Sequence, residues 1–297
     1  MNNINTNNGL LMELKTVQLS AFKTMTEALK ESLKDGTFKI TPPTYDEEGK
    51  MTDSCGVILT AINQSTSVLI KLKLLGMKFE KYYVKSNIPI KITINMSCFY
   101  KLIKTINNDD QMLTLFIDER DPNHLGIKIE NLEKKMSTTY KLIILDSGTK
   151  DLQIPDSEYD AFVIMSSDRF QTIIRNMSVI CDTVNISFID SPTIRDTLIF
   201  YGKGEFASQR TVLQANENIN TVAPENEIII QGVYDLRNLG LFSKCSNLCQ
   251  NVELYMKRDY PIILKYQIAN LGFAHLILTP KVANDDDKSE SEEETTE

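Results

Sequence analysis

Most of this chain alternates between apolar and polar residues with a period of two, which is the pattern of half-buried β-strands. Over residues 90–96, isoleucine and methionine at the even positions alternate with lysine, threonine and asparagine at the odd positions. Similar runs recur at 125–129, 140–145, 184–189, 252–256 and 262–268. The pattern predicts antiparallel sheets with one face on a core and the other face in solvent.

Four stretches show instead the apolar spacing of amphipathic helices, and we predict helices at 19–34, 97–107, 167–178 and 235–246. The residues expected to face inward are Phe22, Met25, Leu29 and Leu33, then Phe99, Leu102, Ile103 and Ile106, then Phe170, Ile173, Ile174 and Met177, and finally Leu236, Leu239 and Phe242. The expected fold class is therefore α+β, with strands predominating.

An internal repeat organises these elements. Residues 92–118 and 162–190 share the order strand, short helix, strand, and Phe99 and Lys104 match Phe170 and Arg175 at a constant offset. Because the first and fourth helices occupy comparable positions, we predict two similar domains with two helices inside and antiparallel sheets outside. The expected boundaries are 1–145 for the first domain, 146–160 for a connecting loop, 161–284 for the second domain and 285–297 for an acidic tail.

Two irregular regions interrupt the alternation. Residues 146–160 combine Gly148, Pro155 and several acids with the apolar residues Leu152 and Ile154, which is typical of a loop that presents a hydrophobic patch. Residues 41–53 contain consecutive prolines and several charges, and predict a long hairpin excursion in the first domain.

The charge is unevenly distributed. The chain of 297 residues has a formal charge of −8, but residues 285–297 alone contain eight carboxylates and one lysine. The rest of the chain is therefore almost neutral, which excludes a globally basic nucleic-acid binder and leaves room for a local basic surface. The acidic run itself is expected to be solvated, with a role in solubility or in binding.

Every predicted helix carries basic side chains outside its apolar stripe. These are Lys23 and Lys30, Lys101 and Lys104, Arg175, and Arg237 and Lys244. Lysine on the solvent face of one helix is ordinary. The same arrangement on all four helices of a nearly neutral chain favours a one-sided surface that meets phosphate groups.

Catalytic, metal and membrane signals are weak. The five cysteines are odd in number, and only His124 and His275 could join them as ligands, so we expect no metal site and no cofactor. There is no phosphate-binding glycine loop and no nucleophile elbow, so we do not expect an enzyme. No apolar run reaches the length of a membrane span, and the first residues lack a signal-peptide layout, so we expect an intracellular protein with no membrane partner.

Three segments resemble the proliferating cell nuclear antigen family of sliding clamps. They are SCFYKLIKTINNDD at 97–110, LQIPDSEYDAFVIMSSDRFQTIIRNMS at 152–178 and YPIILKYQIANLGFAHLILTPK at 260–281. The resemblance extends over about 10–284 and is poorest at 36–56 and 190–232. The composition, rich in Asn, Ile and Lys, and the enlarged loop at 41–53 favour a large DNA virus or a protist with an A/T-rich genome.

The resemblance implies a DNA polymerase processivity factor, in which three identical subunits form a ring around double-stranded DNA without sequence specificity. The positions that match the family's hole-lining residues are Lys23, Lys30, Lys101, Lys104, Arg175, Arg237 and Lys244. In the family a strand of one subunit pairs with an edge strand of the next, which here implies 138–145 and about 205–213. For 138–145 an internal strand is an equal alternative.

The resemblance also implies a pocket for short clamp-binding motifs, carried by DNA polymerase, the clamp loader and other replication and repair proteins. The matching positions are Ile62, Leu152, Ile154, Pro261, Ile277 and Pro280, with a core role as the alternative. Ile277 stands where many members have an aromatic residue, and Thr24 and Thr172 stand where relatives are basic.

Other functions stay open beside the sliding clamp. They are a clamp-like viral late-transcription factor, a subunit of a heterotrimeric checkpoint clamp, and a structural or capsid component. The expected site of action is the nucleus or a cytoplasmic site of viral replication.

Overall fold

The computed structural model describes residues 9–63, 65–106, 111–131, 133–146, 158–191, 197–214, 219–221 and 228–281. The chain divides into two compact units: unit 1 comprises Met1–Ile154, Asn247–Cys249 and Tyr266–His275, and unit 2 comprises Pro155–Ser246, Gln250–Lys265 and Leu276–Glu297. Leu152, Ile154 and the acidic run 285–297 lie outside the described residues, as does most of the expected connecting loop.

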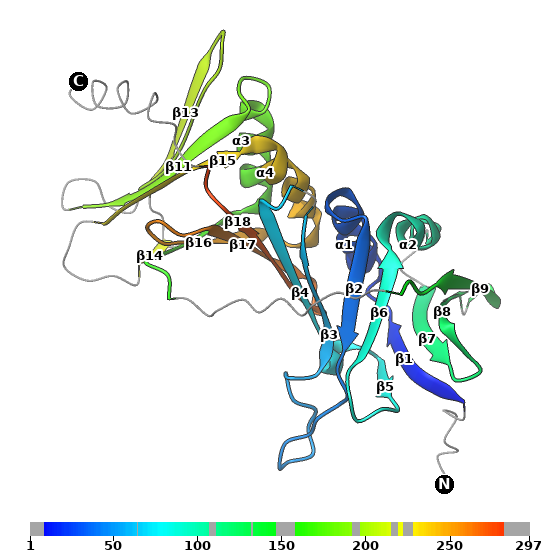
Figure 1. Cartoon of the computed structure of the whole chain (residues 1–297). Helices are drawn as coiled ribbons and strands as arrows, with labels where there is room; N and C mark the ends of the chain where they lie inside the picture. Colours follow the sequence, from blue (N-terminus) through cyan, green and yellow to red (C-terminus); the bar gives the residue numbers. More distant parts are fainter. Residues whose placement is uncertain are drawn as a thin grey trace. The chain divides into compact units, whose positions relative to one another are not determined.

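One module of a strand, a helix and three strands occurs four times along the chain (Figure 1). The first two modules are β1 (Leu10–Thr16), α1 (Leu19–Ser32), β2 (Asp35–Ile40), β3 (Gly56–Ile62) and β4 (Val68–Leu75), then β6 (Ile90–Asn95), α2 (Met96–Ile103), β7 (Gln111–Asp118), β8 (Asp121–Asn131) and β9 (Met136–Ile143). The other two are β10 (Ala161–Ser166), α3 (Ser167–Met177), β11 (Thr183–Asp190), β12 (Thr197–Lys203) and β13 (Ser208–Leu213), then β15 (Ile228–Asp235), α4 (Leu236–Ser243), β16 (Asn251–Met256), β17 (Ile262–Ile268) and β18 (Gly272–Leu278). The repeat predicted from the sequence is therefore confirmed.

Short elements connect or extend these modules. They are the 3₁₀ helices η1 (Gly76–Lys78) and η2 (Lys244–Leu248), and the strands β5 (Lys81–Val84) and β14 (Ile219–Thr221). In unit 1 one sheet has the order β5-β1-β7-β8-β9, and the strands β6-β2-β3-β4 are neighbours in a second sheet. In unit 2 the order β14-β10-β16-β17-β18 corresponds to the five-stranded sheet of unit 1, and the order β15-β11-β12-β13 corresponds to β6-β2-β3-β4.

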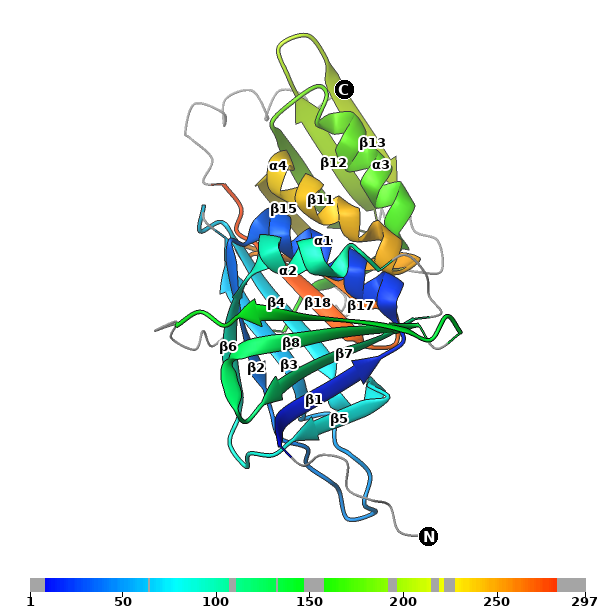
Figure 2. The same ribbon diagram turned by 90° about the vertical axis from the view of Figure 1, so that its right-hand side faces the viewer.

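The helices pair within each unit, and their apolar stripes are buried as predicted. Figure 2 shows α1 beside α2 across the ends of the unit 1 strands, and the Phe22 and Phe99 rings meet edge to face with centroids 6.2 Å apart. Of the predicted inward residues, only Leu102 is half-buried rather than buried. The four predicted helices are thus confirmed.

Three helix ends were predicted too far along the chain: α1 ends at Ser32 rather than 34, α4 ends at Ser243 rather than 246 and is followed by η2, and α2 shows the largest difference. α2 ends at Ile103, whereas the sequence pattern continued to residue 107. The hydroxyl of Thr105 donates to the Leu102 carbonyl (2.7 Å), which satisfies one of the end carbonyls and favours a turn there. At the other end, the Asn95 side chain caps the helix by accepting from the Cys98 N–H (2.9 Å).

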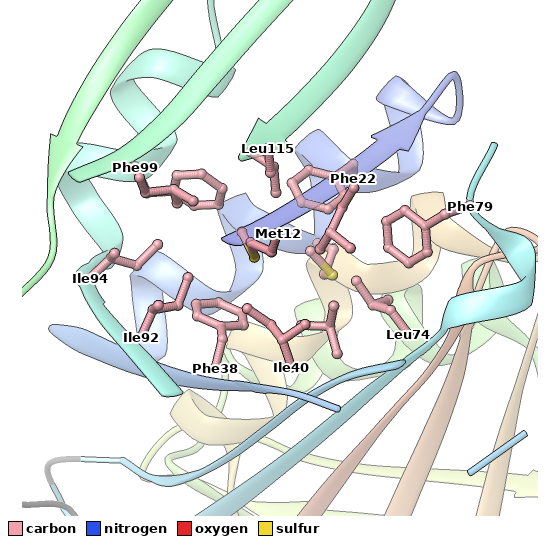
Figure 3. A pocket seen from close by; sticks show the side chains of 14 residues that line it. Met12, Phe22, Phe38, Ile40, Leu74, Phe79, Ile92, Ile94, Phe99 and Leu115 are labelled. Carbon is pink, nitrogen blue, oxygen red and sulfur yellow. The ribbon is translucent and has the colours of Figure 1, made fainter. Parts of the chain in front are cut away.

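The core of unit 1 contains a small cavity between the two helices and both sheets. Figure 3 shows Phe22 and Phe99 from the helices and Phe38, Ile92 and Leu115 from the strands around it. Its volume is about 30 Å³, and all of its lining residues are apolar. A space of this size and character leaves nearby side chains short of contacts rather than forming a ligand site.

The predicted excursion at 41–53 is confirmed as a hairpin between β2 and β3. Tyr45 and Met51 form an isolated antiparallel bridge, and the Asp46 N–H donates to the Lys50 carbonyl (2.9 Å).

Candidate nucleic-acid and partner interfaces

Two exposed lysines of unit 1 lie on and just after α2. Lys101 and Lys104 are exposed, three residues apart and therefore close together on one side of the helix. Neither lysine has an ion-pair partner among the described residues, and α2 contains no acidic residue. These two ammonium groups can therefore reach an external phosphate without first breaking an internal contact.

The lysines of α1 are differently placed. The Lys23 ammonium donates to the Ile106 carbonyl (3.2 Å), beyond the end of α2, and Lys30 pairs with Glu31 (3.1 Å) while lying 4.3 Å from the Tyr100 ring centroid. The Glu31 carboxylate raises the pKa of Lys30. Since α1 also contains Glu27, its two lysines are balanced by two acids within the helix.

In unit 2, Arg175 of α3 and Arg237 of α4 are exposed and have no ion-pair partner among the described residues. Lys244 belongs to η2, the 3₁₀ turn that follows α4, and its side chain is outside what the structure describes. Arg169 is a further exposed cation of α3 that the sequence analysis left out. It is six positions before Arg175, so the two side chains leave the helix on different sides.

Both strands expected to lie at open edges do so. β9 is the last strand of the five-stranded sheet, which resolves the alternative left open for 138–145, and β13 is the last strand of the four-stranded sheet. Each is paired on one side only among the described residues, with β8 and with β12 respectively. Exposed apolar side chains accompany both edges: Met136 and Ile143 on β9, and Val212 on β13.

The residues expected to bind partner motifs are divided between the units. In unit 1, Ile62 ends β3 with 44% of its surface exposed. In unit 2, Pro261 and Pro280 are half-buried and Ile277 is buried within β18. Ile277 therefore contributes to the core, while Leu152 and Ile154 lie outside the described residues.

The sites for other chemistry that were weighed from the sequence are not assembled in the described part of the chain. No group of three His, Cys, Asp or Glu side chains there could hold a metal ion. None of the five cysteines, all of which are described, forms a disulfide, and Cys55 and Cys245 are buried. Among the described helices, none is long and apolar enough to cross a membrane.

Comparison with known proteins agrees with this architecture. Residues 11–151 match the model for the proliferating cell nuclear antigen N-terminal domain, and residues 153–281 match that for its C-terminal domain. Among solved structures, proliferating cellular nuclear antigen from Entamoeba histolytica has a TM-score of 0.77 at 19% identity, covering 92% of this chain and 100% of that one. This likeness places the fold in the class of clamp proteins.

Two viral proteins are also similar to this chain over most of its length. A probable DNA polymerase sliding clamp 1 of Paramecium bursaria Chlorella virus 1 is 26% identical over 91% of this chain and 97% of its own length. A probable DNA polymerase sliding clamp of Acanthamoeba polyphaga mimivirus is 25% identical over 92% of this chain and 63% of its own length. With both domain models matched, the chain belongs to the proliferating cell nuclear antigen family, and the resemblance seen in the sequence is confirmed.

Proposed function

We propose that this chain is a DNA sliding clamp that serves as a processivity factor for a DNA polymerase, acting inside the cell where viral DNA is replicated. The observation that carries the proposal is a set of exposed cations on or next to the helices α2, α3 and α4, namely Lys101, Lys104, Arg175 and Arg237, which have no ion-pair partner among the described residues. Contacts of lysine and arginine to phosphate are blind to sequence and individually weak, so a duplex held by them can slide. The role requires no chemical step by the protein.

Within this proposal the seven basic positions have unequal roles. Lys101, Lys104, Arg175 and Arg237 form the main phosphate-contacting set. Lys23 and Lys30 contribute less, because phosphate has to compete with the Ile106 carbonyl and with Glu31 for their ammonium groups. Lys244, next to α4, completes the set.

We further propose that three copies close into a ring through β9 of one copy and β13 of the next, with 1–145 and 161–284 as the clamp domains and 146–160 as their connector. Head-to-tail pairing that closes on itself removes both open edges. Light scattering tests this directly, with an expected mass of about three times 33.8 kDa. Ile143→Asp on β9 should lower that mass, whereas Tyr45→Asp, at a residue 61% exposed in the hairpin between β2 and β3, should not.

A trimer that also extends the products of a DNA polymerase on primed templates supports the clamp. A stable monomer that binds transcription proteins, or a complex that forms only with two different subunits, would overturn it in favour of the late-transcription or checkpoint alternatives. Equal DNA effects of unmodified protein and of a Lys101→Ala/Lys104→Ala variant would favour a structural component.

The partner site is proposed at Ile62, Leu152, Ile154, Pro261, Ile277 and Pro280. Exposed Ile62 is its best-supported member, whereas Ile277 is buried. Ile62→Ser should weaken binding of a peptide with the clamp-binding motif at least tenfold without lowering the melting temperature. Unchanged affinity would remove this residue from the site.

A further inference from the structure

The outward face of β3 and β4 in unit 1 changes from apolar to basic along the strands. The two strands are antiparallel neighbours (Figure 2), and residues that lie opposite each other share a face. The outward-facing pairs are Ile62 with Leu69, Thr60 with Lys71, and Ile58 with Lys73. All six residues are exposed or half-buried, whereas the alternate residues of β4 are buried in the core. Exposed Ile62 therefore stands at the apolar end of a face whose other end carries lysine.

The basic end of this face has no internal counter-charge on its own strands. β3 and β4 contain no acidic residue, and neither Lys71 nor Lys73 has an ion-pair partner among the described residues. Both side chains are half-buried, so their aliphatic stems cover the sheet while the ammonium groups remain in water. Lys39 of β2 lies opposite Ile58 and adds a further positive charge to the same face. The complement of this end is a ligand that carries negative charge.

The register sets the spacing between the apolar residue and the two lysines. Adjacent strands are about 4.8 Å apart, and same-face residues of one strand about 6.7 Å apart. The Cα atom of Lys71 is therefore about 8 Å from that of Ile62, and the Cα atom of Lys73 about 14 Å from it. An extended peptide advances about 3.3 Å per residue, so these distances match positions about two and four residues from an anchor at Ile62.

A protein segment fits this face better than a nucleic acid. Proteins hold single-stranded nucleic acid largely by stacking bases on aromatic side chains, and neither β3 nor β4 contains an aromatic residue. Ile62 and Leu69 offer instead an aliphatic surface for an apolar side chain. A peptide can supply both that side chain and carboxylates at fixed intervals from it.

We propose that the site around Ile62 selects partner motifs with acidic residues on one flank, and that Lys71 and Lys73 bind these carboxylates about two and four residues from the apolar anchor. The inference rests on the partner site proposed above at Ile62. It adds a charge requirement to that site, so partners with a neutral or basic flank bind more weakly than partners with an acidic one.

Fluorescence anisotropy of labelled synthetic peptides with the full chain tests the proposal. Each peptide has the clamp-binding motif with aspartate two and four residues from its apolar anchor, before the motif in one peptide and after it in the other. Counterpart peptides have asparagine at the same positions. We expect one acidic peptide to bind about fivefold more tightly than its counterpart, because exposed ion pairs each contribute modestly. Lys71→Gln/Lys73→Gln should abolish this gain and leave the affinity for the asparagine peptide unchanged, which also shows that the variant is folded.

Lys134→Gln/Lys135→Gln is the matched control, because it removes the same charge from the turn between β8 and β9, and it should retain the gain. Charge reversal by Lys71→Glu/Lys73→Glu should make a peptide with lysine at the two positions bind more tightly than the aspartate peptide. The proposal is overturned if aspartate and asparagine peptides bind the unmodified chain equally, or if the gain survives Lys71→Gln/Lys73→Gln. Loss of all peptide binding in Ile62→Ser, with no gain from aspartate in the unmodified chain, removes only the charge requirement. Unchanged binding of every peptide in Ile62→Ser removes the partner site as well.

Discussion

The exposed lysine pair after the second helix gives a quantitative test of the DNA interface. Each chain offers four exposed cations of the proposed phosphate-contacting set, namely Lys101, Lys104, Arg175 and Arg237, and none of the four has an ion-pair partner among the described residues. Changing Lys101 and Lys104 to alanine removes half of that charge. Neither side chain is buried, so the double substitution should leave the free energy of unfolding within about 0.5 kcal/mol of the original value.

The expected effect follows from counterion release. If each of the four cations neutralises one phosphate, log K falls with log salt concentration at a slope of about −3.6 per bound chain, and at about −1.8 for the double variant. Between 50 and 200 mM salt these slopes correspond to losses in affinity of about 150-fold and about 12-fold. The ratio of the two slopes is one half, whatever number of copies contacts the duplex.

Fluorescence anisotropy of a labelled short duplex, titrated at several salt concentrations, measures both slopes. Lys134→Ala/Lys135→Ala is the matched control, because these lysines are also adjacent and exposed but lie in the turn between β8 and β9. The reasoning is refuted if the variant at 101 and 104 keeps the original slope, or if the control at 134 and 135 reduces it equally.

Three further predictions concern stability. Glu13 is 7% exposed, and burial alone would raise its pKa, but ion pairs with Lys81 and Lys15 hold that pKa below its ordinary value of 4.5. Lys81→Met should therefore lower the free energy of unfolding by about 1–3 kcal/mol, measured with denaturant at pH 7. Because the folded pKa is depressed, that difference is present above pH 4.5 and should shrink as the pH falls through the lowered pKa. Val57→Ile places one methylene group toward the cavity of unit 1 and should raise the free energy of unfolding by about 0.5–1 kcal/mol. Val84→Ile, outside the cavity lining, should be neutral or destabilising, and equal effects of the two substitutions would contradict the cavity argument. Gly56 has φ +153°, and a Cβ there would lie 2.0 Å from a backbone oxygen of β4, so Gly56→Ala should lower stability by about 3 kcal/mol or more in the same assay, and a neutral result would show that the backbone can shift.

The helices and the repeat were accessible from the sequence because apolar periodicity is set by the same burial that forms them. Phe99 and Phe170, at matching positions of two modules, are both buried, and Lys104 and Arg175 are both exposed. The end of α2 was missed because it depends on one hydroxyl, that of Thr105, which competes for a helix carbonyl. Such a local contact leaves no trace in the periodicity.

Which of the basic residues have internal partners could not be predicted in the same way. Periodicity places Lys23 and Lys101 alike outside an apolar stripe, but Lys23 reaches a carbonyl 83 residues away in sequence. The partner of Lys30 stands next to it in sequence as Glu31, and this signal was available but was not weighed. A contact with a distant segment in the case of Lys23, and with the neighbouring residue in the case of Lys30, therefore makes each ammonium group less available to phosphate.

The lengths of the edge strands bear on how copies of the chain could pair. β5 and β14, which cover the first strands of two modules, have four and three residues, and short edge strands offer little backbone for intermolecular pairing. β9 and β13 have eight and six residues and carry exposed apolar side chains such as Ile143 and Val212. Long open edges of this kind aggregate unless a specific partner covers them. Among the described strands, β6 and β15 also end a sheet, but their outer edges receive hydrogen bonds from Leu145, and from Arg258 and Lys281, respectively. The proposed pairing of β9 with β13 of another copy would cover two edges that are paired on one side only among the described residues. The Ile143→Asp variant measures how much the assembly depends on that pairing.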